Sequence, residues 1–375
     1  MNKPSFDDVL NALRTVNDPD LHRDLVTLNM VRDLKVFDDG KVSLRVVLTT
    51  PACPLKDKIK NDVITAVQAT GATQIDVVMD AEVRKVSGRP AGASANPAAG
   101  SHHGIPGVAH IIAVSSGKGG VGKSTVSVNL ATALALEGAT VGLLDADIYG
   151  PNIPTMMGVT ENPKLVQDPI KGEMFIPPVS HGVKVMSMGF LLQGDQPVIW
   201  RGPMLHNILN QFCNRVEWGK LDYLVLDLPP GTGDVQLSLA QMLPLSGAVI
   251  VTTPQEIALQ DVRKALNMWE KVKVPALGVV ENMSHFTGDD GKKYYIFGQG
   301  GGEILAKKFH TQVLAQMPLV PQVREGGDTG RPIVVKDPQS ESAKLFRELA
   351  QKVAREVVLL DTKAPNQGGL EIGKF

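Results

Sequence analysis

The nine residues Gly117-Lys118-Gly119-Gly120-Val121-Gly122-Lys123-Ser124-Thr125 match the phosphate-binding pattern G-x-x-x-x-G-K-[ST]. Before them, residues 108–114 form a short apolar run of strand length. After them, apolar residues recur at helical spacing until Gly138. A strand, a glycine-rich turn and a helix in this order direct backbone N–H groups and a helix N-terminus at one point, where a polyphosphate is attracted. The sequence therefore predicts a nucleotide-binding site.

Two side chains of this loop have predictable partners. We expect Lys123 to lie along the β- and γ-phosphates of ATP and the Ser124 hydroxyl to ligate Mg²⁺. The predicted nucleotide-binding residues of the loop are Gly117, Lys118, Gly119, Gly120, Val121, Gly122, Lys123, Ser124 and Thr125.

Three later segments supply further candidates at the ends of predicted strands. Asp147 is a candidate to orient the attacking water, although an aspartate at this place also serves as a turn or helix cap. Asp227 is expected to hold Mg²⁺ through water, and Gly231 to offer an N–H to the γ-phosphate. Asn282 has the donor and acceptor that pair with the edge of adenine.

The composition excludes several classes of protein. The 375 residues have a formal net charge of −1, which gives no basic excess for binding nucleic acid. The polar N-terminus does not resemble a secretory signal, and no apolar stretch approaches the ~18 residues of a membrane span. Two cysteines in the whole chain fit a reducing cytoplasm and give no disulfide framework. We therefore expect a cytoplasmic protein with no nucleic-acid or membrane partner.

Periodicity divides the chain into a small α+β unit and a larger α/β unit. In residues 1–89 we expect a helix that starts at Ser5 and buries Phe6, Leu10, Leu13 and Val16. A hairpin over 31–49, a helix marked by Ile59, Val63 and Val67, and a strand over 74–83 follow. Residues 90–107 are small and without apolar periodicity, so we interpret them as a linker.

From residue 108 onward strands and helices alternate. Continuous apolar runs at 140–144, 221–226, 248–252 and 276–280 are typical of parallel strands covered on both faces. A last helix is expected within 342–360, with Leu345, Leu349, Val353 and Val357 buried, and residues 361–375 are interpreted as a tail. The sequence predicts an α/β fold with a mostly parallel sheet over 108–360, plus the small α+β domain over 1–89.

The second lysine of the loop points to a particular group of ATPases. The pattern K-G-G-x-G-K-[ST], with Lys118 first, resembles the deviant P-loop ATPases that include MinD and ParA. In that group the extra lysine crosses a dimer interface to the partner's nucleotide, in a role like that of an arginine finger. The resemblance implies a catalytic role for Lys118, beside Lys123 and Asp147, in a homodimer.

Further segments resemble the Mrp family of iron–sulfur cluster carrier ATPases. They are Asp145-Ala146-Asp147-Ile148-Tyr149-Gly150-Pro151-Asn152, Trp200-Arg201-Gly202-Pro203-Met204, Asp227-Leu228-Pro229-Pro230-Gly231-Thr232-Gly233-Asp234, Ile296-Phe297-Gly298 and Gly327-Asp328-Thr329-Gly330-Arg331-Pro332-Ile333. The N-terminal unit is similar to the MIP18-like domain, through 17–21 and 49–54. The resemblance implies a cytoplasmic dimer that binds a labile cluster, transfers it to apo iron–sulfur proteins or assembly factors, and hydrolyses ATP slowly.

The thiols depart from that family. Its members usually have a C-x-x-C pair before I-F-G, whereas this chain has Asp289-Asp290-Gly291 there, which predicts a surface turn. Thiolates suit iron–sulfur clusters and hard carboxylates do not. Cys213 is expected to be buried on a helix. Cys53 matches the cysteine of the MIP18-like domain. Two alternatives stay open: Cys53 acts as a ligand in cluster binding or transfer, or it has no functional role. A MinD/ParA-type dimer switch without a cluster is the alternative function.

Overall fold

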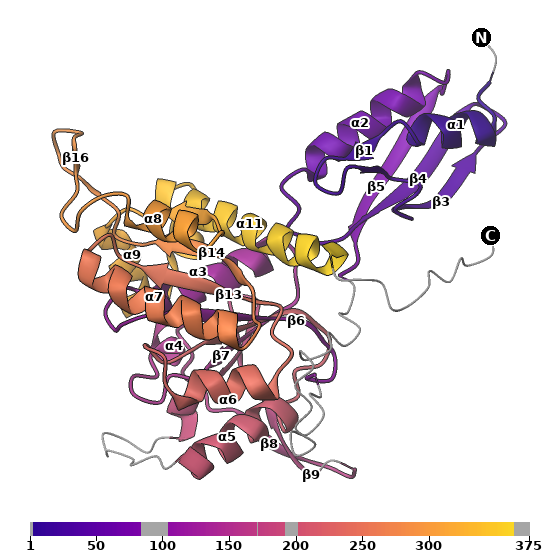
Figure 1. Ribbon diagram of the computed structural model, residues 1–375. Helices are drawn as coiled ribbons and strands as arrows, with labels where there is room; N and C mark the ends of the chain where they lie inside the picture. Colours follow the sequence, from indigo (N-terminus) through magenta and orange to yellow (C-terminus); the bar gives the residue numbers. More distant parts are fainter. Residues whose placement is uncertain (1–2, 84–103, 171, 192–201, 364–375) are drawn as a thin grey trace. The chain divides into compact units, whose positions relative to one another are not determined.

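The computed structural model describes residues 3–83, 104–170, 172–191 and 202–363 (Figure 1). The chain forms two compact units, Met1–Arg89 with Ala354–Phe375, and Pro90–Val353. The predicted boundaries at 89/90, 107/108 and 360/361 stay predictions, and most of the expected linker and tail lies outside the described residues.

The N-terminal unit begins with a capped helix. Helix α1 spans Phe6–Leu13, and the Ser5 and Asp8 side chains form a capping box at its start. Val9 and Leu13 are buried, whereas Phe6 is 46% exposed, so the predicted apolar face was wrong at Phe6. Val9 and Leu13 lie four residues apart on α1, so they share its buried face.

A three-stranded sheet and a second helix complete this unit. Its elements are β1 (Asn17–Asp18), β2 (Arg23–Asp24), β3 (Val31–Val36), β4 (Lys41–Leu48), α2 (Lys56–Gln68) and β5 (Gln74–Ala81). The predicted hairpin is confirmed, since β3 pairs antiparallel with β4. Strand β5 pairs parallel with β4 on its other side. Alternate residues of β4 from Val42 to Leu48 face α1 and the predicted α2 residues in one apolar core.

The second unit is built on an eight-stranded sheet. Its strands are β6 (Val108–Ser116), β7 (Val141–Asp145), β10 (Val179–Ser180), β11 (Val183–Ser187), β12 (Leu221–Asp227), β13 (Gly247–Thr252), β14 (Ala276–Glu281) and β17 (Val313–Gln316). Their order is β10-β11-β7-β12-β6-β13-β14-β17, and every neighbouring pair except β10–β11 is parallel. The predicted α/β fold with a mostly parallel sheet is confirmed.

Helices flank this sheet (Figure 1). They are α3 (Lys123–Leu136), α4 (Ile153–Met156), α5 (Gly202–Asn214), α6 (Asp234–Met242), α7 (Glu256–Lys271), α8 (Gly301–Lys308), α9 (Pro321–Asp328), α10 (Ile333–Lys336) and α11 (Glu341–Lys363), with a 3₁₀ turn at Met188–Leu191. Strand β6 is central, and the chain proceeds to β7 on one side of it and to β13 on the other. Ligands of such sheets bind where the strand order reverses, beyond the carboxyl ends of the strands.

Two small hairpins lie outside the main sheet. One pairs β8 (Lys164–Asp168) with β9 (Gly172–Ile176), and the other pairs β15 (Phe286–Thr287) with β16 (Lys293–Tyr294). The second contains the predicted surface turn, closed by a hydrogen bond from Gly291 N to Gly288 O of 2.9 Å. The last helix is confirmed, but Leu345 is only half-buried, and Phe346 is among the residues that α11 buries.

Candidate nucleotide site

The backbone of the P-loop requires glycine at three places, and Gly120 is one of them because its φ is +80°. Gly122, which precedes α3, has φ of +83°, and a Cβ there would lie 2.2 Å from the Asn282 Nδ2. A Cβ on Gly117 would lie 2.3 Å from the backbone nitrogen of Val262 in α7. At Gly119, by contrast, a Cβ would meet no atom within 4 Å, because this residue faces open space. The loop is thus fixed from behind and open in front.

A cavity of about 440 Å³ lies in front of this loop. Its lining comes from the P-loop, the segment after β7 and the segment after β12: Ser116, Lys118, Gly119, Gly120, Gly122, Lys123, Ser124, Thr125, Asp147, Tyr149, Gly150, Asn152, Met156 and Pro230. This is the place at the carboxyl ends of the strands that the topology favours.

Lys123 lies among carboxylates at the base of the cavity. Its ammonium is 2.9 Å from Asp227 Oδ2 and 3.5 Å from Asp147 Oδ2, and only 6% of the residue is exposed. The Ser124 hydroxyl donates to Asp227 Oδ2 at 2.7 Å. A hydroxyl and a carboxylate side by side are hard oxygen donors of the kind that Mg²⁺ prefers, so these residues fit the predicted magnesium site.

Asp227 is held from the other side by a residue that the sequence reasoning did not select. The Ser127 hydroxyl donates to Asp227 Oδ1 at 2.6 Å, and both side chains are fully buried. Ser127 lies four residues after Lys123 on α3, hence on the same face of the helix, and this spacing was the signal that could have found it.

Asp145 organises the segment that contains Asp147. Its Oδ1 accepts the backbone N–H of Asp147 at 3.1 Å, and its Oδ2 accepts the Ser187 hydroxyl at 2.8 Å. The pKa of Asp145 is raised to about 8. The larger cause is burial, and the smaller is the nearby negative charge of Asp227. Asp145 therefore supports the cavity wall from inside the protein.

Asp147 makes the contacts of a turn cap, and its role in orienting water stays a prediction. Its Oδ1 accepts the backbone N–H groups of Tyr149 at 3.1 Å and Gly150 at 3.3 Å, as a turn cap does. Its Oδ2 faces the Lys123 ammonium inside the cavity. The capping contacts fix the carboxylate where a water-orienting group is predicted, so the two uses do not exclude each other.

Three other residues that are predicted to bind nucleotide form hydrogen bonds within the protein. Lys118 donates to the side-chain oxygen of Gln255 at 3.2 Å. The N–H of Gly231 donates to Ser116 O at 2.9 Å, so a contact with a γ-phosphate requires this bond to open. Asn282 is nearly buried, and its Nδ2 donates to Val121 O at 2.9 Å behind the P-loop. Their predicted contacts with nucleotide stay predictions.

Neither cysteine is among the residues that line this cavity. Cys53 belongs to the N-terminal unit and is half-buried, and burial raises its pKa to about 11. Cys213 on α5 is buried, as predicted, and burial raises its pKa to about 12. Among the described residues, three or more His, Cys, Asp or Glu side chains nowhere gather as a metal site. Any role of Cys53 as a ligand stays a prediction.

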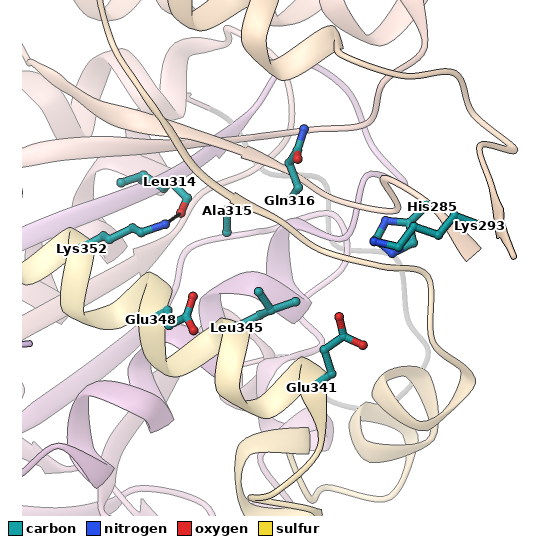
Figure 2. A pocket seen from close by; sticks show the side chains of 9 residues that line it. All are labelled: His285, Lys293, Leu314, Ala315, Gln316, Glu341, Leu345, Glu348 and Lys352. Atoms are coloured by element: carbon teal, nitrogen blue, oxygen red, sulfur yellow. Dashed lines mark hydrogen bonds between the residues drawn. The ribbon is translucent and has the colours of Figure 1, made fainter. Parts of the chain in front are cut away.

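A second hollow, of about 280 Å³, lies at the outer edge of the sheet (Figure 2). One face of α11 lines it through Glu341, Leu345, Glu348 and Lys352, and strand β17 forms its floor. Lys352 donates to the carbonyl of Leu314 at 2.8 Å and so covers part of the strand edge. The charged side chains are solvated, which makes this a surface groove and leaves the P-loop cavity as the candidate site.

The fold and the cavity define the class, a P-loop NTPase. A model of the family described as "NUBPL iron-transfer P-loop NTPase" matches residues 107–354, and one described as "Iron-sulfur cluster assembly protein" matches residues 7–77. The chain belongs to this family of iron-transfer P-loop NTPases, joined to an iron–sulfur assembly domain. The predicted resemblance to iron–sulfur carrier ATPases with a MIP18-like domain is confirmed.

Individual proteins agree with this assignment. An iron–sulfur cluster carrier protein of Synechocystis sp. is 50% identical over 94% of this chain and 97% of its own length. The chloroplastic Fe-S cluster assembly factor HCF101 of Arabidopsis thaliana is 47% identical over 93% of this chain and 63% of its own. A solved nucleotide-binding protein of Archaeoglobus fulgidus, in complex with ADP, has a TM-score of 0.55 and 38% identity, over 64% of this chain and 93% of its own.

None of the described helices is long and apolar enough to cross a membrane.

Proposed function

We propose that this chain binds and hydrolyses ATP and acts as a cytoplasmic homodimer that transfers iron–sulfur clusters to apo iron–sulfur proteins or assembly factors. The observation that supports this most directly is the cluster of Lys123, Ser124 and Asp227 within 3.2 Å of one another, at a P-loop of an iron-transfer family. The same three groups bind phosphate and magnesium in NTPases of this class.

Binding of Mg·ATP exchanges the partners of these groups. The backbone N–H groups of the P-loop and the N-terminus of α3 would hold the phosphates, and Lys123 would turn from the carboxylates to them. Mg²⁺ would be held by the Ser124 hydroxyl and, through water, by Asp227, where it neutralises phosphate charge. Because Lys123 already neutralises Asp227, one buried charge pair is replaced by another, and no buried charge stays unpaired.

Hydrolysis then needs an oriented water and added positive charge. Asp147 would orient the water, since its second oxygen faces the cavity while the first is fixed by backbone N–H groups. Lys118 of a second copy would approach the phosphates as charge develops, after it leaves Gln255. Gly231 would donate to the γ-phosphate, and Asn282 would bind adenine with the oxygen that it does not use on the P-loop.

The iron–sulfur cluster is the group that the protein would transfer. Which residues of the chain ligate it is the remaining question. Cys53 is a candidate because Cys213 is buried inside the apolar core. Burial raises the pKa of Cys53 to about 11, so the thiol is protonated at neutral pH and would release its proton on binding iron.

Anaerobic reconstitution with iron and sulfide tests the proposal. Wild type, Cys53→Ala and Cys213→Ala should be compared for bound iron, acid-labile sulfide and phosphate released from ATP. We expect wild type and the Cys213 variant to take up iron and sulfide, the Cys53 variant to take up neither, and all three to release phosphate. Equal uptake by the Cys53 variant would remove this thiol from the mechanism.

Two other outcomes decide between functions. Nucleotide turnover with no iron in any of the proteins would favour the MinD/ParA-type switch. That alternative has one observation in its favour, the turn at Asp289-Asp290-Gly291 in place of a cysteine pair. Iron uptake without any phosphate release would show a carrier that does not hydrolyse ATP.

A further inference from the structure

Strand β5 forms an edge of the three-stranded sheet in the N-terminal unit, whose order is β3-β4-β5. On one side it pairs with β4 over its whole length, from Gln74 opposite Lys41 to Ala81 opposite Leu48. On its other side no described strand pairs with it. A free edge presents a row of backbone N–H and C=O groups with which another extended segment can pair.

The opposite edge of this sheet is protected against such pairing. Strand β3 contains Arg32, Asp33 and Lys35, its pairing with β4 is irregular between Arg32 and Lys35, and Asp33 has a φ of +51°. Bulges and basic side chains of this kind prevent a further strand from adding to an edge. Strand β5 pairs in regular register and contains no proline, lysine or arginine. It is therefore the edge that stays open to a partner.

The apolar side of β5 is only partly covered. Figure 1 shows α1 and α2 over one face of this sheet. Under these helices, alternate residues of β4 from Val42 to Leu48 are at most 3% exposed. Ile75, Val77 and Met79 of β5 pack on the same core but are only half-buried. Apolar residues on a further strand would complete their burial.

The other side of β5 carries acidic groups. Arg45 of β4 pairs with Asp33 at 2.8 Å and with Asp80 at 3.0 Å, so charges alternate in sign from strand to strand across this face. Asp76 is exposed on the same face as Asp80, and Val78 between them is 54% exposed. Basic residues on a further strand would continue the alternation of charge.

These charges disfavour a second copy of β5 as the partner. In an antiparallel pair of two β5 strands centred on Val78, Asp76 of one copy would lie opposite Asp80 of the other. Like charges directly opposite each other destabilise a pair of strands, and opposite charges stabilise it. The edge therefore suits a strand that differs from β5 in charge.

We infer that the free edge of β5 is a docking strand for an extended segment of a partner protein in which basic and apolar residues alternate. The basic residues would face Asp76 and Asp80, and the apolar residues would cover Ile75, Val77 and Met79. In this mode of recognition, backbone hydrogen bonds supply affinity and alternate side chains supply specificity.

The position of β5 relates this edge to Cys53. Strands β4 and β5 are parallel, so their carboxyl ends lie at the same end of the sheet, where the Glu82 N–H donates to Leu48 O at 2.9 Å. Cys53 belongs to the loop that follows β4 at this end. This relation rests on the proposed function, in which the partner is an apo iron–sulfur protein and Cys53 is a candidate ligand. A docked segment would hold the acceptor at the end of the sheet from which that loop extends.

Two synthetic peptides as long as β5 distinguish strand docking from attraction between charges. In the alternating peptide lysine and valine alternate, and in the block peptide the same lysines all precede the same valines. Fluorescence anisotropy measures binding of each labelled peptide to the full chain, without nucleotide or iron. The edge variant is Asp76→Lys with Asp80→Lys. Its control, the α2 variant, is Asp57→Lys with Asp62→Lys, which makes the same change of charge at exposed residues of α2.

We expect wild type and the α2 variant to bind the alternating peptide at least about tenfold more tightly than the block peptide. The edge variant should bind the alternating peptide at least about tenfold more weakly than wild type does. Matching thermal unfolding of the two variants checks that the edge variant is folded.

Three results would overturn the docking strand: equal binding of both peptides by wild type, binding of neither, or equal binding of the alternating peptide by the two variants. The wild-type comparison decides the matter even where the edge variant is unstable. Because the assay contains no nucleotide and no iron, a failure of ATP hydrolysis or of cluster uptake would leave its result unchanged.

Discussion

The Lys118 ammonium nitrogen lies 3.2 Å from the side-chain oxygen of Gln255, in a hydrogen bond that joins the P-loop to the residue before α7. The lysine that is proposed to act on a partner's nucleotide is therefore held by its own chain in the monomer. Because Gln255 is neutral, this bond costs little to break compared with an ion pair to a carboxylate. The hydrogen bond therefore restrains Lys118 in the monomer but leaves it able to move to a partner's nucleotide.

We predict that Lys118→Ala binds ATP nearly as wild type does but hydrolyses it much more slowly. Lys123 and the loop backbone stay in place for binding, whereas the charge supplied to the transition state is lost. Groups in this role change turnover on the order of a thousandfold or more. Steady-state phosphate release and equilibrium binding of a fluorescent ATP analogue measure the two effects. Unchanged turnover would sink the role of Lys118 in trans.

Substitutions of Gln255 should show whether release of Lys118 from this residue limits ATP turnover. Gln255→Glu would turn the hydrogen bond into an ion pair and retain Lys118, so we expect turnover to fall several-fold while ATP binding by the monomer is kept. Gln255→Leu removes the acceptor at similar volume, and we expect turnover equal to or above wild type. Since salt screens the new ion pair, the loss in the Glu variant should shrink at high ionic strength. Equal turnover in both variants at low salt would contradict this model.

Ser127→Ala should weaken magnesium binding without unfolding the protein. The substitution removes the hydroxyl that donates to Asp227 Oδ1 at 2.6 Å, and residues that orient a metal ligand in this way typically contribute about tenfold or more to affinity. Titration of ATP hydrolysis with Mg²⁺ measures the shift. Thr132→Val is the control, because this buried hydroxyl on α3 bonds to Val128 O and makes no contact with Asp227. An identical magnesium requirement in both variants would count against this role of Ser127.

The sequence predicted the central strands and the P-loop helix because their signals are local. A strand buried on both faces, such as residues 221–226, consists of apolar residues almost without interruption. Strand β17 has four residues and the β8–β9 hairpin is largely exposed, so neither leaves a clear apolar period. They were not predicted.

The residues of the candidate site could likewise be predicted only where their signal in the sequence is local. Ser127 could be found because helical spacing relates it to Lys123. Gln255 could not, because it meets Lys118 across 137 residues of chain through the packing of α7 behind Gly117. The state of Cys53 could not be predicted either, since a thiol's pKa depends on burial that the sequence does not show.

Asp145→Asn should change how stability depends on pH in the absence of nucleotide. The folded-state pKa of Asp145 is about 8 against an ordinary value of 3.8, so between these values the folded state binds more protons than the unfolded state. The contribution of this group to the free energy of unfolding therefore falls as pH rises through that window. Asparagine resembles the protonated acid and does not titrate, so the variant should gain stability relative to wild type from about pH 5 toward about pH 8. Urea unfolding at several pH values measures this, and parallel profiles for the two proteins would contradict it.

The reactivity of Cys53 should reflect its burial. Burial raises its pKa to about 11 from an ordinary 9.0, so at neutral pH the native thiol is almost wholly protonated. In the Cys213→Ala protein, where Cys53 is the remaining thiol, iodoacetamide should react about a hundredfold more slowly with the native than with the unfolded chain. The native rate should rise about tenfold per pH unit above neutrality, because only the thiolate reacts. Mass spectrometry of timed samples measures both rates. A native rate equal to that of the unfolded chain would show a thiol that is already activated, as a cysteine poised to accept a cluster without displacement of its surroundings would be.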